Sequence, residues 1–291
     1  VFQRREYQRM KSAGEASLQW FDAHCHFDFE VYEGRREGDW AQASAAGVAG
    51  VMIPGVSRAL TEALMKRPSQ GWNQHCLAGL HPYWCHEHHS SDLDFLEQAL
   101  KQLKSAAVGE AGLDVHLAKS GQVAMETQWQ WLQPQVELAE HLRLPLVLHV
   151  RGMHDELWSF LRRRSFSYGG LVHAFSGSEQ QGRRWHELGF ALGVGGAMTH
   201  PRAQRLRRTL TALPSEALLL ETDSPDMLPA FLGGRVNVPA MIPLYGAILA
   251  RLRNMDSLSE IAQIQQQNLY RIFPLLAVNS SENSAFNSLK D

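Results

Sequence analysis

Two histidines, His24 and His26, stand two positions apart in the stretch "FDAHCH" at 21–26. If this stretch ends a β-strand, both side chains point to the same side and their imidazoles could reach one point. Cys25 between them would point the opposite way, so we expect it to pack in the core rather than bind a metal as a thiolate. Such a pair also arises by chance in loops, and only the rest of the chain distinguishes a chance pair from a pair of metal ligands.

Histidines and carboxylates also close other apolar runs of the chain. Imidazole and carboxylate groups are suitable ligands for Zn²⁺, Mn²⁺ or Mg²⁺. One metal would use His24, His26 and a carboxylate, but the whole set exceeds the needs of one open site, so two divalent ions are expected. Two ions roughly 3.5–4 Å apart can activate a water and stabilise a phosphoryl displacement. Beyond Asp22 in the first run, these residues are His81, Glu110, His149, His173 and Asp223.

Within this set, two carboxylates have expected catalytic roles. Glu110 follows the fourth apolar run and is the natural bridge between two ions. Asp223 follows the eighth run, where it could bind one metal and accept the proton of the attacking water.

The elements that must position these residues form a repeated alternation. Eight short apolar runs, each closed by polar or turn residues, alternate with segments of helical character. Eight such units favour a closed (β/α)₈ TIM barrel over an open doubly wound sheet. In such a barrel the active site lies at the carboxyl ends of the strands, where the residues above fall. The runs span 18–26, 47–56, 76–82, 106–114, 144–151, 169–177, 189–198 and 217–225, and the clearest helical segments 92–105, 125–143, 154–164 and 178–189.

Composition narrows the class of protein. Of the 291 residues 44% are hydrophobic and 20% charged, as in a folded protein with a sizeable core. The formal net charge of −2 excludes a global basic field, so any polyanion must be held locally. Three cysteines favour a reducing, cytoplasmic environment, and no apolar run is long enough to span a membrane. We expect a polar extension at 1–17, a single barrel domain at 18–276 and a polar tail at 277–291. The expected state is a monomer, with an oligomer as the alternative.

The motifs then resemble a known family. They occur in the family's order from about Phe21 to about Phe273. Together they resemble the TatD-type metal-dependent deoxyribonucleases of the amidohydrolase superfamily, most of all the bacterial YjjV-like branch. The family's barrel fold and its metal-dependent hydrolysis of DNA phosphodiesters, including exonuclease action, are therefore expected here. The motifs are "FDAHCHFDF", "GLHP", "GEAGLD", "LPLVLHVR", "HAFSGS" and "LETDSPDM".

The resemblance also implies roles for residues. His81 corresponds to a family position near the substrate phosphate. Two departures from the family, His200 before Pro201 and Ala240 after Pro239, leave substrate preference open. The implied ligands are His24, His26, Glu110 and Asp223 for one metal, and Glu110, His149 and His173 for the second.

Other residues near the expected site have two interpretations each. Arg151 and Arg202 are candidate phosphate contacts, although most arginines of this kind are solvated. Trp84 could stack on an unpaired base or anchor a loop. The cluster His86, His88 and His89 is expected to be a solvated loop, with a lid or metal patch as the alternative. Asp155 is expected to cap a helix, and Pro134 to mark a first turn or a kink.

The preferred function is hydrolysis of DNA by two metal ions, acting on single strands or frayed ends because a narrow barrel mouth reaches a strand end most easily. The alternatives are a metal-dependent hydrolase of amides or esters, on a small or aminoacyl substrate, and a non-catalytic metal-binding protein. Arginines near the mouth would favour the nuclease, and an apolar pocket the amide or ester hydrolase. The open donor set disfavours a structural site, which is usually closed by four Cys or His ligands.

Overall fold

Eight parallel strands form the centre of the molecule, one in or beside each predicted run. The structure is a computed structural model that describes residues 18–67 and 72–277. The predicted extension 1–17 and all but the first residue of the predicted tail lie outside the described residues. The strands are β1 Trp20–Asp22, β2 Val48–Ile53, β3 Gln74–Cys76, β4 Val108–Asp114, β5 Leu146–Arg151, β6 Gly170–Val172, β7 Phe190–Val194 and β8 Leu218–Leu220.

The strands follow one another in space as they do in sequence. They form two sheets, β1-β2-β3 and β4 to β8 in order, with every neighbouring pair parallel. Backbone hydrogen bonds cross both seams: Gly109 N donates to Ala78 O over 2.9 Å, and Ala23 N to Leu220 O over 3.2 Å. The result is the barrel-like α/β fold that the alternation predicted.

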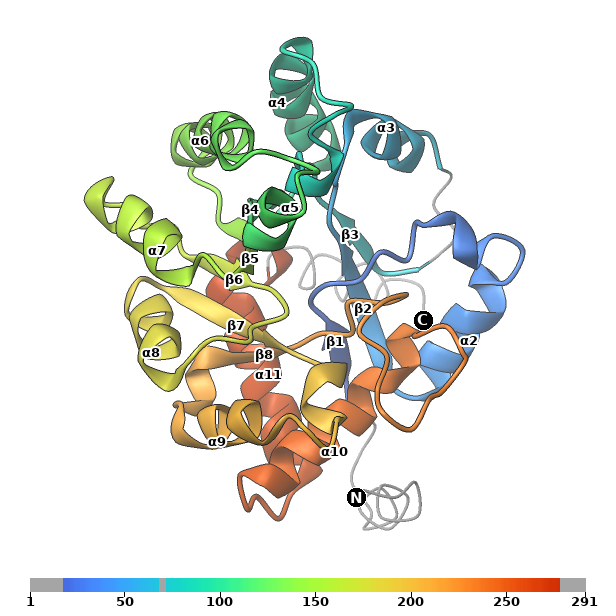
Figure 1. Cartoon of the computed structure of the whole chain (residues 1–291). Coiled ribbons are helices and arrows are strands. Elements are labelled where there is room, and N and C mark those ends of the chain that lie inside the picture. The colour runs from blue at the N-terminus through green and yellow to red at the C-terminus, as the bar shows by residue number, and fades with distance from the viewer. Residues whose placement is uncertain (1–17, 68–71, 278–291) are drawn as a thin grey trace.

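Helices surround these strands (Figure 1). All four predicted helical segments are helices, and the polar faces of these helices lie outward. The α-helices are α2 Arg36–Ala45, α3 Arg58–Lys66, α4 Ser91–Leu103, α5 Val115–Lys119, α6 Met125–Leu142, α7 His154–Arg163, α8 Glu179–Glu187, α9 Gln204–Ala212, α10 Ile242–Leu252 and α11 Leu258–Ile272. The 3₁₀ helices are η1 Glu30–Tyr32, η2 Pro82–Trp84, η3 Gly196–Thr199, η4 Ser215–Ala217 and η5 Pro239–Met241.

A layer of buried side chains fills the inside of the strand ring. Each strand, or the residue beside it, contributes one small or medium apolar side chain, and the chains pack against each other as inward-facing residues of a small barrel do. Leu269 and Ile272 of α11 pack against this layer, which supports the site from below. The layer consists of Ala23, Met52, Leu77, Ala107, Val147, Leu171, Ala191 and Leu219.

Three local predictions need correction. β3 begins at Gln74, upstream of the predicted run, and only the isolated bridge from Ala78 to Val108 continues it. Pro134 lies well inside α6, which excludes the first turn and leaves the kink as the prediction. Asp155 does not cap α7; its carboxylate instead pairs with Arg184 of α8 at 3.0 Å, because α8 packs beside α7.

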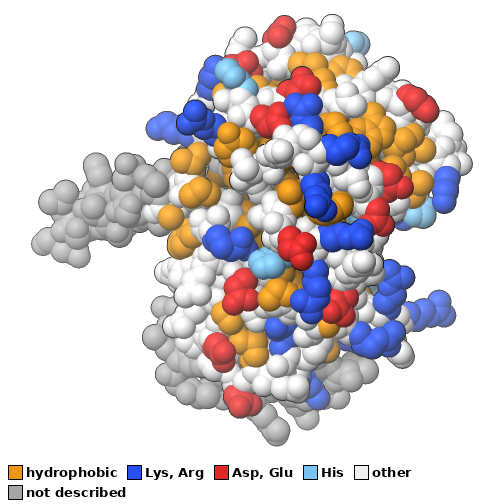
Figure 2. Space-filling view, turned by 90° about the vertical axis from the view of Figure 1, so that its left-hand side faces the viewer, with side chains coloured by type: hydrophobic (Ala, Val, Ile, Leu, Met, Phe, Trp, Pro, Cys, Tyr) orange, Lys and Arg blue, Asp and Glu red, His pale blue; other side chains and the backbone are white. Residues whose placement is uncertain are grey.

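The surface agrees with the modest net charge. Figure 2 shows the side on which α6, α7 and α8 lie in Figure 1, and Lys and Arg there are mixed with Asp and Glu. Arg162 and Arg184 both lie over the ring of Trp158, at 5.0 and 5.2 Å. These two arginines of α7 and α8 therefore have a partner on the surface of the same chain. Among the described residues, no helix combines the length and apolar character that crossing a membrane requires.

Candidate metal centre

The strand register aims two histidines into the barrel. His149 and His173 stand two residues after Val147 and Leu171 of the inner layer, so their side chains share the inward direction. His173 directly follows β6, as predicted. His149 and Glu110 lie inside β5 and β4 rather than at the strand ends. The β4–β5 register is irregular between Val108 and Ala111, the stretch that contains Glu110.

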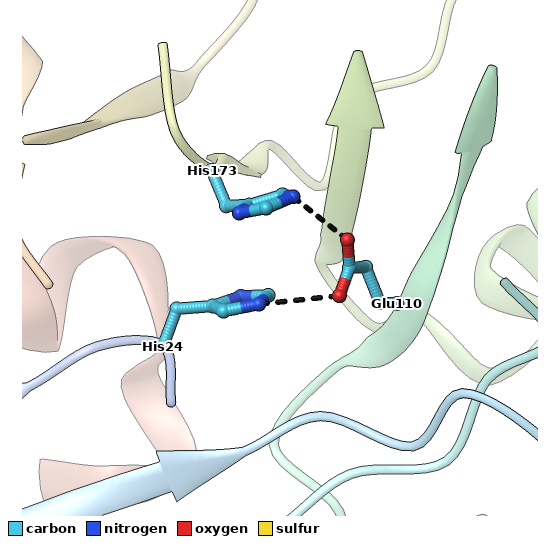
Figure 3. A group of neighbouring side chains, drawn as sticks. All are labelled: His24, Glu110 and His173. Carbon is cyan, nitrogen blue, oxygen red and sulfur yellow. Dashed lines mark ion pairs between the residues drawn. The ribbon is translucent and has the colours of Figure 1, made fainter. Parts of the chain in front are cut away.

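Glu110 lies at the centre of the cluster. Its Oε2 is 3.2 Å from His24 Nε2, and its Oε1 is 2.7 Å from His173 Nε2. The two imidazoles are stacked, with centroids 4.1 Å apart and planes at 7°, and each faces one carboxylate oxygen (Figure 3). His149 Nδ1 lies 3.2 Å from Oε1 as well. One carboxylate thus joins donors that lie on or just after three other strands.

His26 and Asp223 complete the cluster on the side of β1 and β8. Asp223 Oδ1 lies 3.6 Å from His24 Nε2 and 3.7 Å from His26 Nε2. The backbone of Asp223 has φ of +52°, a left-handed conformation uncommon for this residue type, and its N–H donates to His24 O over 2.8 Å. Cys25 packs in the core, as predicted. All six predicted ligands therefore meet at one place.

The charges of these groups favour cation binding. Burial, together with His173, lowers the pKa of His24 to about 4, and burial lowers the pKa of His26 well below its usual value. Burial alone would raise the pKa of Glu110, but His173 and the other nearby histidines hold it well below its usual range. At neutral pH His24 and His26 are therefore neutral and Glu110 is ionised, which are the forms that bind metals. Burial alone would lower the pKa of His173, but Glu110 raises it to about 10, so this ring must release a proton when it binds a metal.

Several ring nitrogens have no hydrogen-bond partner. Nδ1 of His24, His26 and His173 is buried without a hydrogen bond from the described residues, and Nε2 of His24 makes none although it lies 3.2 Å from Glu110 Oε2. Buried polar atoms are nearly always satisfied, so these atoms indicate a ligand. Three groups of donors lie within 4.8 Å of one another: His24/Glu110/His173, His24/His26/Asp223 and His81/Glu110/His149. The residues present thus fit a site for one or two divalent cations.

His81 differs from the other histidines in its hydrogen bonds. Its Nδ1 accepts the N–H of Tyr83 over 3.0 Å, so the neutral ring carries its proton on Nε2. That Nε2 lies 3.2 Å from Glu110 Oε1. His81 is therefore arranged as a donor at the site, which favours contact with a substrate oxygen over metal ligation.

Asp114 is a functional candidate that we did not select from the sequence. Its Oδ2 lies 3.2 Å from His149 Nε2, so it fixes the proton on Nε2 and leaves Nδ1 facing Glu110. The sequence contained a signal for this role. Residues 110 and 114 are an even number of positions apart in one strand, so their side chains point to the same face as each other.

Replacing Asp114 with alanine is expected to weaken metal binding about 10- to 100-fold, because His149 loses the group that orients its ring. Isothermal titration of the metal-stripped protein measures this. Asp94→Ala, in the first turn of α4, is the matched control. Unchanged metal affinity in Asp114→Ala would exclude the orienting role.

Asp22 clamps the two strands that carry His24 and Asp223. Its Oδ1 accepts from Thr222 N over 2.9 Å, and its Oδ2 from the Thr222 hydroxyl over 2.5 Å. Glu221 acts similarly next to His173: its Oε1 accepts the N–H of Ala174 over 2.5 Å. Both carboxyl groups are buried, and they accept hydrogen bonds from neighbouring residues of the chain.

Asp22→Ala is expected to lower the free energy of unfolding by about 2–4 kcal/mol, since two donors of Thr222 lose their buried partner. Urea unfolding measures the change. Asp22→Asn, which keeps one acceptor oxygen, should lose less. An alanine variant as stable as the parent chain would show that the clamp contributes nothing.

A cavity of about 280 Å³ opens over the cluster. Neither Arg151 nor Arg202 lines it: Arg151 is 58% exposed with Nη1 3.8 Å from Asp114, and Arg202 is exposed in the turn before α9. Of the histidine cluster predicted to be solvated, His86 and His89 are exposed, but His88 is buried and its Nε2 lies 3.1 Å from His81 O. The cavity is lined by His26, Phe29, Val56, His81, Tyr83, Trp84, Glu110, His149, His173, Asp223 and Asp226.

The donor cluster lies at one end of a parallel α/β barrel, the end at which such barrels carry their active sites. Residues 21–274 match the profile of the TatD-related DNase family, and the chain belongs to this family. The resemblance found in the motifs is thereby confirmed.

Individual relatives agree with this assignment. The chain is 37% identical over 255 residues to the uncharacterized metal-dependent hydrolase YjjV of Escherichia coli K12, covering 87% of this chain and 96% of that one. It is 31% identical over 244 residues to the 3′-5′ ssDNA/RNA exonuclease TatD of Edwardsiella piscicida, covering 81% and 92%. The crystal structure of Escherichia coli YjjV matches with a TM-score of 0.80 at 36% identity, covering 89% and 99%.

Proposed function

We propose that this chain is a metal-dependent hydrolase that cleaves DNA phosphodiester bonds, removing nucleotides from single-stranded or frayed ends. The observation that carries the proposal is the convergence of four imidazoles and two carboxylates on one buried point, with ring nitrogens left unpaired. Membership of the TatD-related DNase family and the exonuclease name of one relative support DNA as the substrate and the 3′ end as the site of attack.

The donor set divides between two ions. His24, His26, Glu110 and Asp223 would hold one ion, and Glu110, His149 and His173 the other, with Glu110 shared. When bound, two such ions supply Lewis-acid stabilisation of charge on phosphoryl oxygens and lower the pKa of a water. Mg²⁺, Mn²⁺ and Zn²⁺ all suit these ligands.

The chain's own groups would handle protons and position the phosphate. Burial, together with Glu110, raises the pKa of Asp223 to about 7, which suits a general base at neutral pH. His81 would donate its Nε2 proton in a hydrogen bond to a phosphate oxygen. Arg151, exposed at the end of β5, would contact a phosphate further along the strand, and Arg202 one at the rim.

A time course on an end-labelled single-stranded oligonucleotide with Mn²⁺ or Mg²⁺ tests the proposal. We expect a ladder that shortens from one end and is absent for Asp223→Asn, because an amide cannot take the proton. Labels at either end report the polarity. Intact DNA after incubation with folded, metal-loaded protein would contradict the nuclease.

One observation favours the second candidate, a hydrolase of amides or esters. No Lys or Arg is among the described residues that line the cavity, and its wall includes Val56 and aromatic rings. If DNA is left intact, p-nitrophenyl and aminoacyl esters are the next substrates. Ester cleavage that Asp223→Asn removes would establish this candidate instead.

A further inference from the structure

The lining of the cavity contains two chemically different groups of side chains. One group is the donor cluster, and the other includes the aromatic rings of Phe29, Tyr83 and Trp84. Phe29 stacks on the imidazole of His26, with centroids 4.6 Å apart and planes at 21°, so it has a packing partner at the site. Tyr83 and Trp84 contact each other edge to face at 5.5 Å.

The exposure of Tyr83 has no explanation in packing. Its side chain is 52% exposed, one of the few large apolar or aromatic side chains so open in the described part of the chain. The backbone N–H of Tyr83 orients His81, but any residue except proline would supply that group. The ring itself therefore serves neither the core nor the orientation of His81.

The turn that carries these rings is held rigidly relative to Glu110. Gln135 of α6 makes two hydrogen bonds with the backbone of Leu80, at 2.8 and 3.0 Å. The His81 carbonyl oxygen accepts from Trp84 N at 3.0 Å and lies 3.1 Å from His88 Nε2. Because His81 in turn contacts Glu110, the aromatic pair has a defined position beside the metal ligands. This is how a preorganised binding surface is built.

The lack of Lys and Arg among the described lining residues limits what such a surface can bind. With no Lys or Arg among the described lining residues, charge on the substrate is met inside the cavity by the metal site and His81 only. The remaining wall offers flat π-faces, which bind planar rings by stacking. Every nucleobase has such a face, but inside a duplex the neighbouring base pairs cover it.

Resting on the proposed function, we propose that Tyr83 and Trp84 form a stacking surface for the unpaired base next to the scissile phosphate. The enzyme would thereby select nucleotides that carry a base and lie outside a duplex. A paired terminal base would have to fray before it could reach this wall. The surface also makes recognition tolerant of sequence, because stacking does not read hydrogen-bonding edges.

Binding can be measured without turnover. The probe is a short single strand with phosphorothioate linkages and 2-aminopurine at the 3′ or the 5′ end, mixed with the Mn²⁺-loaded full chain. Stacking quenches 2-aminopurine, so we expect a fall in fluorescence on binding. Tyr83→Ala and Trp84→Ala should each lose much of the quench and bind about 5- to 150-fold more weakly. Tyr83→Phe and Trp84→Phe, which keep a ring, should retain both.

The matched control is Tyr168→Ala, which removes a tyrosine before β6, at the opposite end of the barrel, where it packs on Phe166. It should leave quench and affinity unchanged. Replacing the terminal nucleotide by an abasic residue should weaken binding to the parent chain and have little further effect on Trp84→Ala. Thermal melting of each variant reports whether it is folded.

The outcomes separate this inference from the proposed function. Metal-dependent cleavage that ignores the base and both alanine substitutions would overturn the stacking surface and leave the nuclease intact. Failure of the folded, metal-loaded chain to bind or cleave any strand would overturn both. Loss of the quench in the alanine variants and its retention in the phenylalanine variants would support the surface.

Discussion

Glu110→Gln is expected to abolish hydrolysis and empty the site of metal while the fold remains. Glu110 contacts donors from several strand ends, with His173 at 2.7 Å and His24 at 3.2 Å. An amide is neutral and offers one good acceptor where the carboxylate offers two, so a bridging position cannot be kept. We expect turnover to fall by about 10³-fold or more, equivalent to about 4 kcal/mol of transition-state stabilisation.

Three measurements check this expectation together. Metal content by elemental analysis should fall, the rate on the labelled oligonucleotide should vanish, and circular dichroism should be unchanged. The control is Glu97→Gln, which removes the same charge from the surface of α4, where Glu97 pairs with Lys101. Full activity in Glu110→Gln would disprove the bridging role.

Removal of metal is expected to have an effect of similar size on activity and a further effect on stability. Dialysis against a chelator should stop hydrolysis, and added Mn²⁺ or Mg²⁺ should restore it. An ion present at 100 times its Kd adds about 2.7 kcal/mol to folding stability. For a chain of this length that corresponds to roughly 5–10 °C in Tm.

A variant without the first two ligands shows whether this shift comes from the site. His24→Ala/His26→Ala should lose most of the Tm difference between metal-loaded and stripped protein. Were elemental analysis to show metal-free protein with its activity and Tm intact, neither the two-ion site nor the metal dependence of the hydrolysis would stand.

The residues of the cluster could be predicted from the sequence because each is a histidine or carboxylate within or directly after its own apolar run. Eight apolar runs alternate with helical segments, and this pattern indicates a barrel whose carboxyl strand ends converge. His24, His173 and Asp223 follow their strands closely, so their convergence could be inferred before any coordinates. The inference extended to Glu110 and His149, although both lie inside their strands.

The roles of the supporting residues depend on contacts between distant parts of the chain. Asp22 bonds Thr222, 200 positions away, and Gln135 bonds Leu80, 55 positions away. His88 is buried because Trp131 packs against its ring at 5.1 Å, which the polar composition of its own segment does not reveal. Asp155 pairs across to α8 instead of capping α7.

The sequence by itself therefore determined the fold class and the residues that meet at the candidate metal centre, since hydrophobic periodicity and residue type act within single strands and helices. Only the tertiary structure decided which groups orient the ligands and which side chains line the cavity. Those properties arise from the packing of elements against one another, where burial and partner distances are set. The exposed ring of Tyr83 beside Glu110 is such a property, and the specificity of this site depends on it in our proposal.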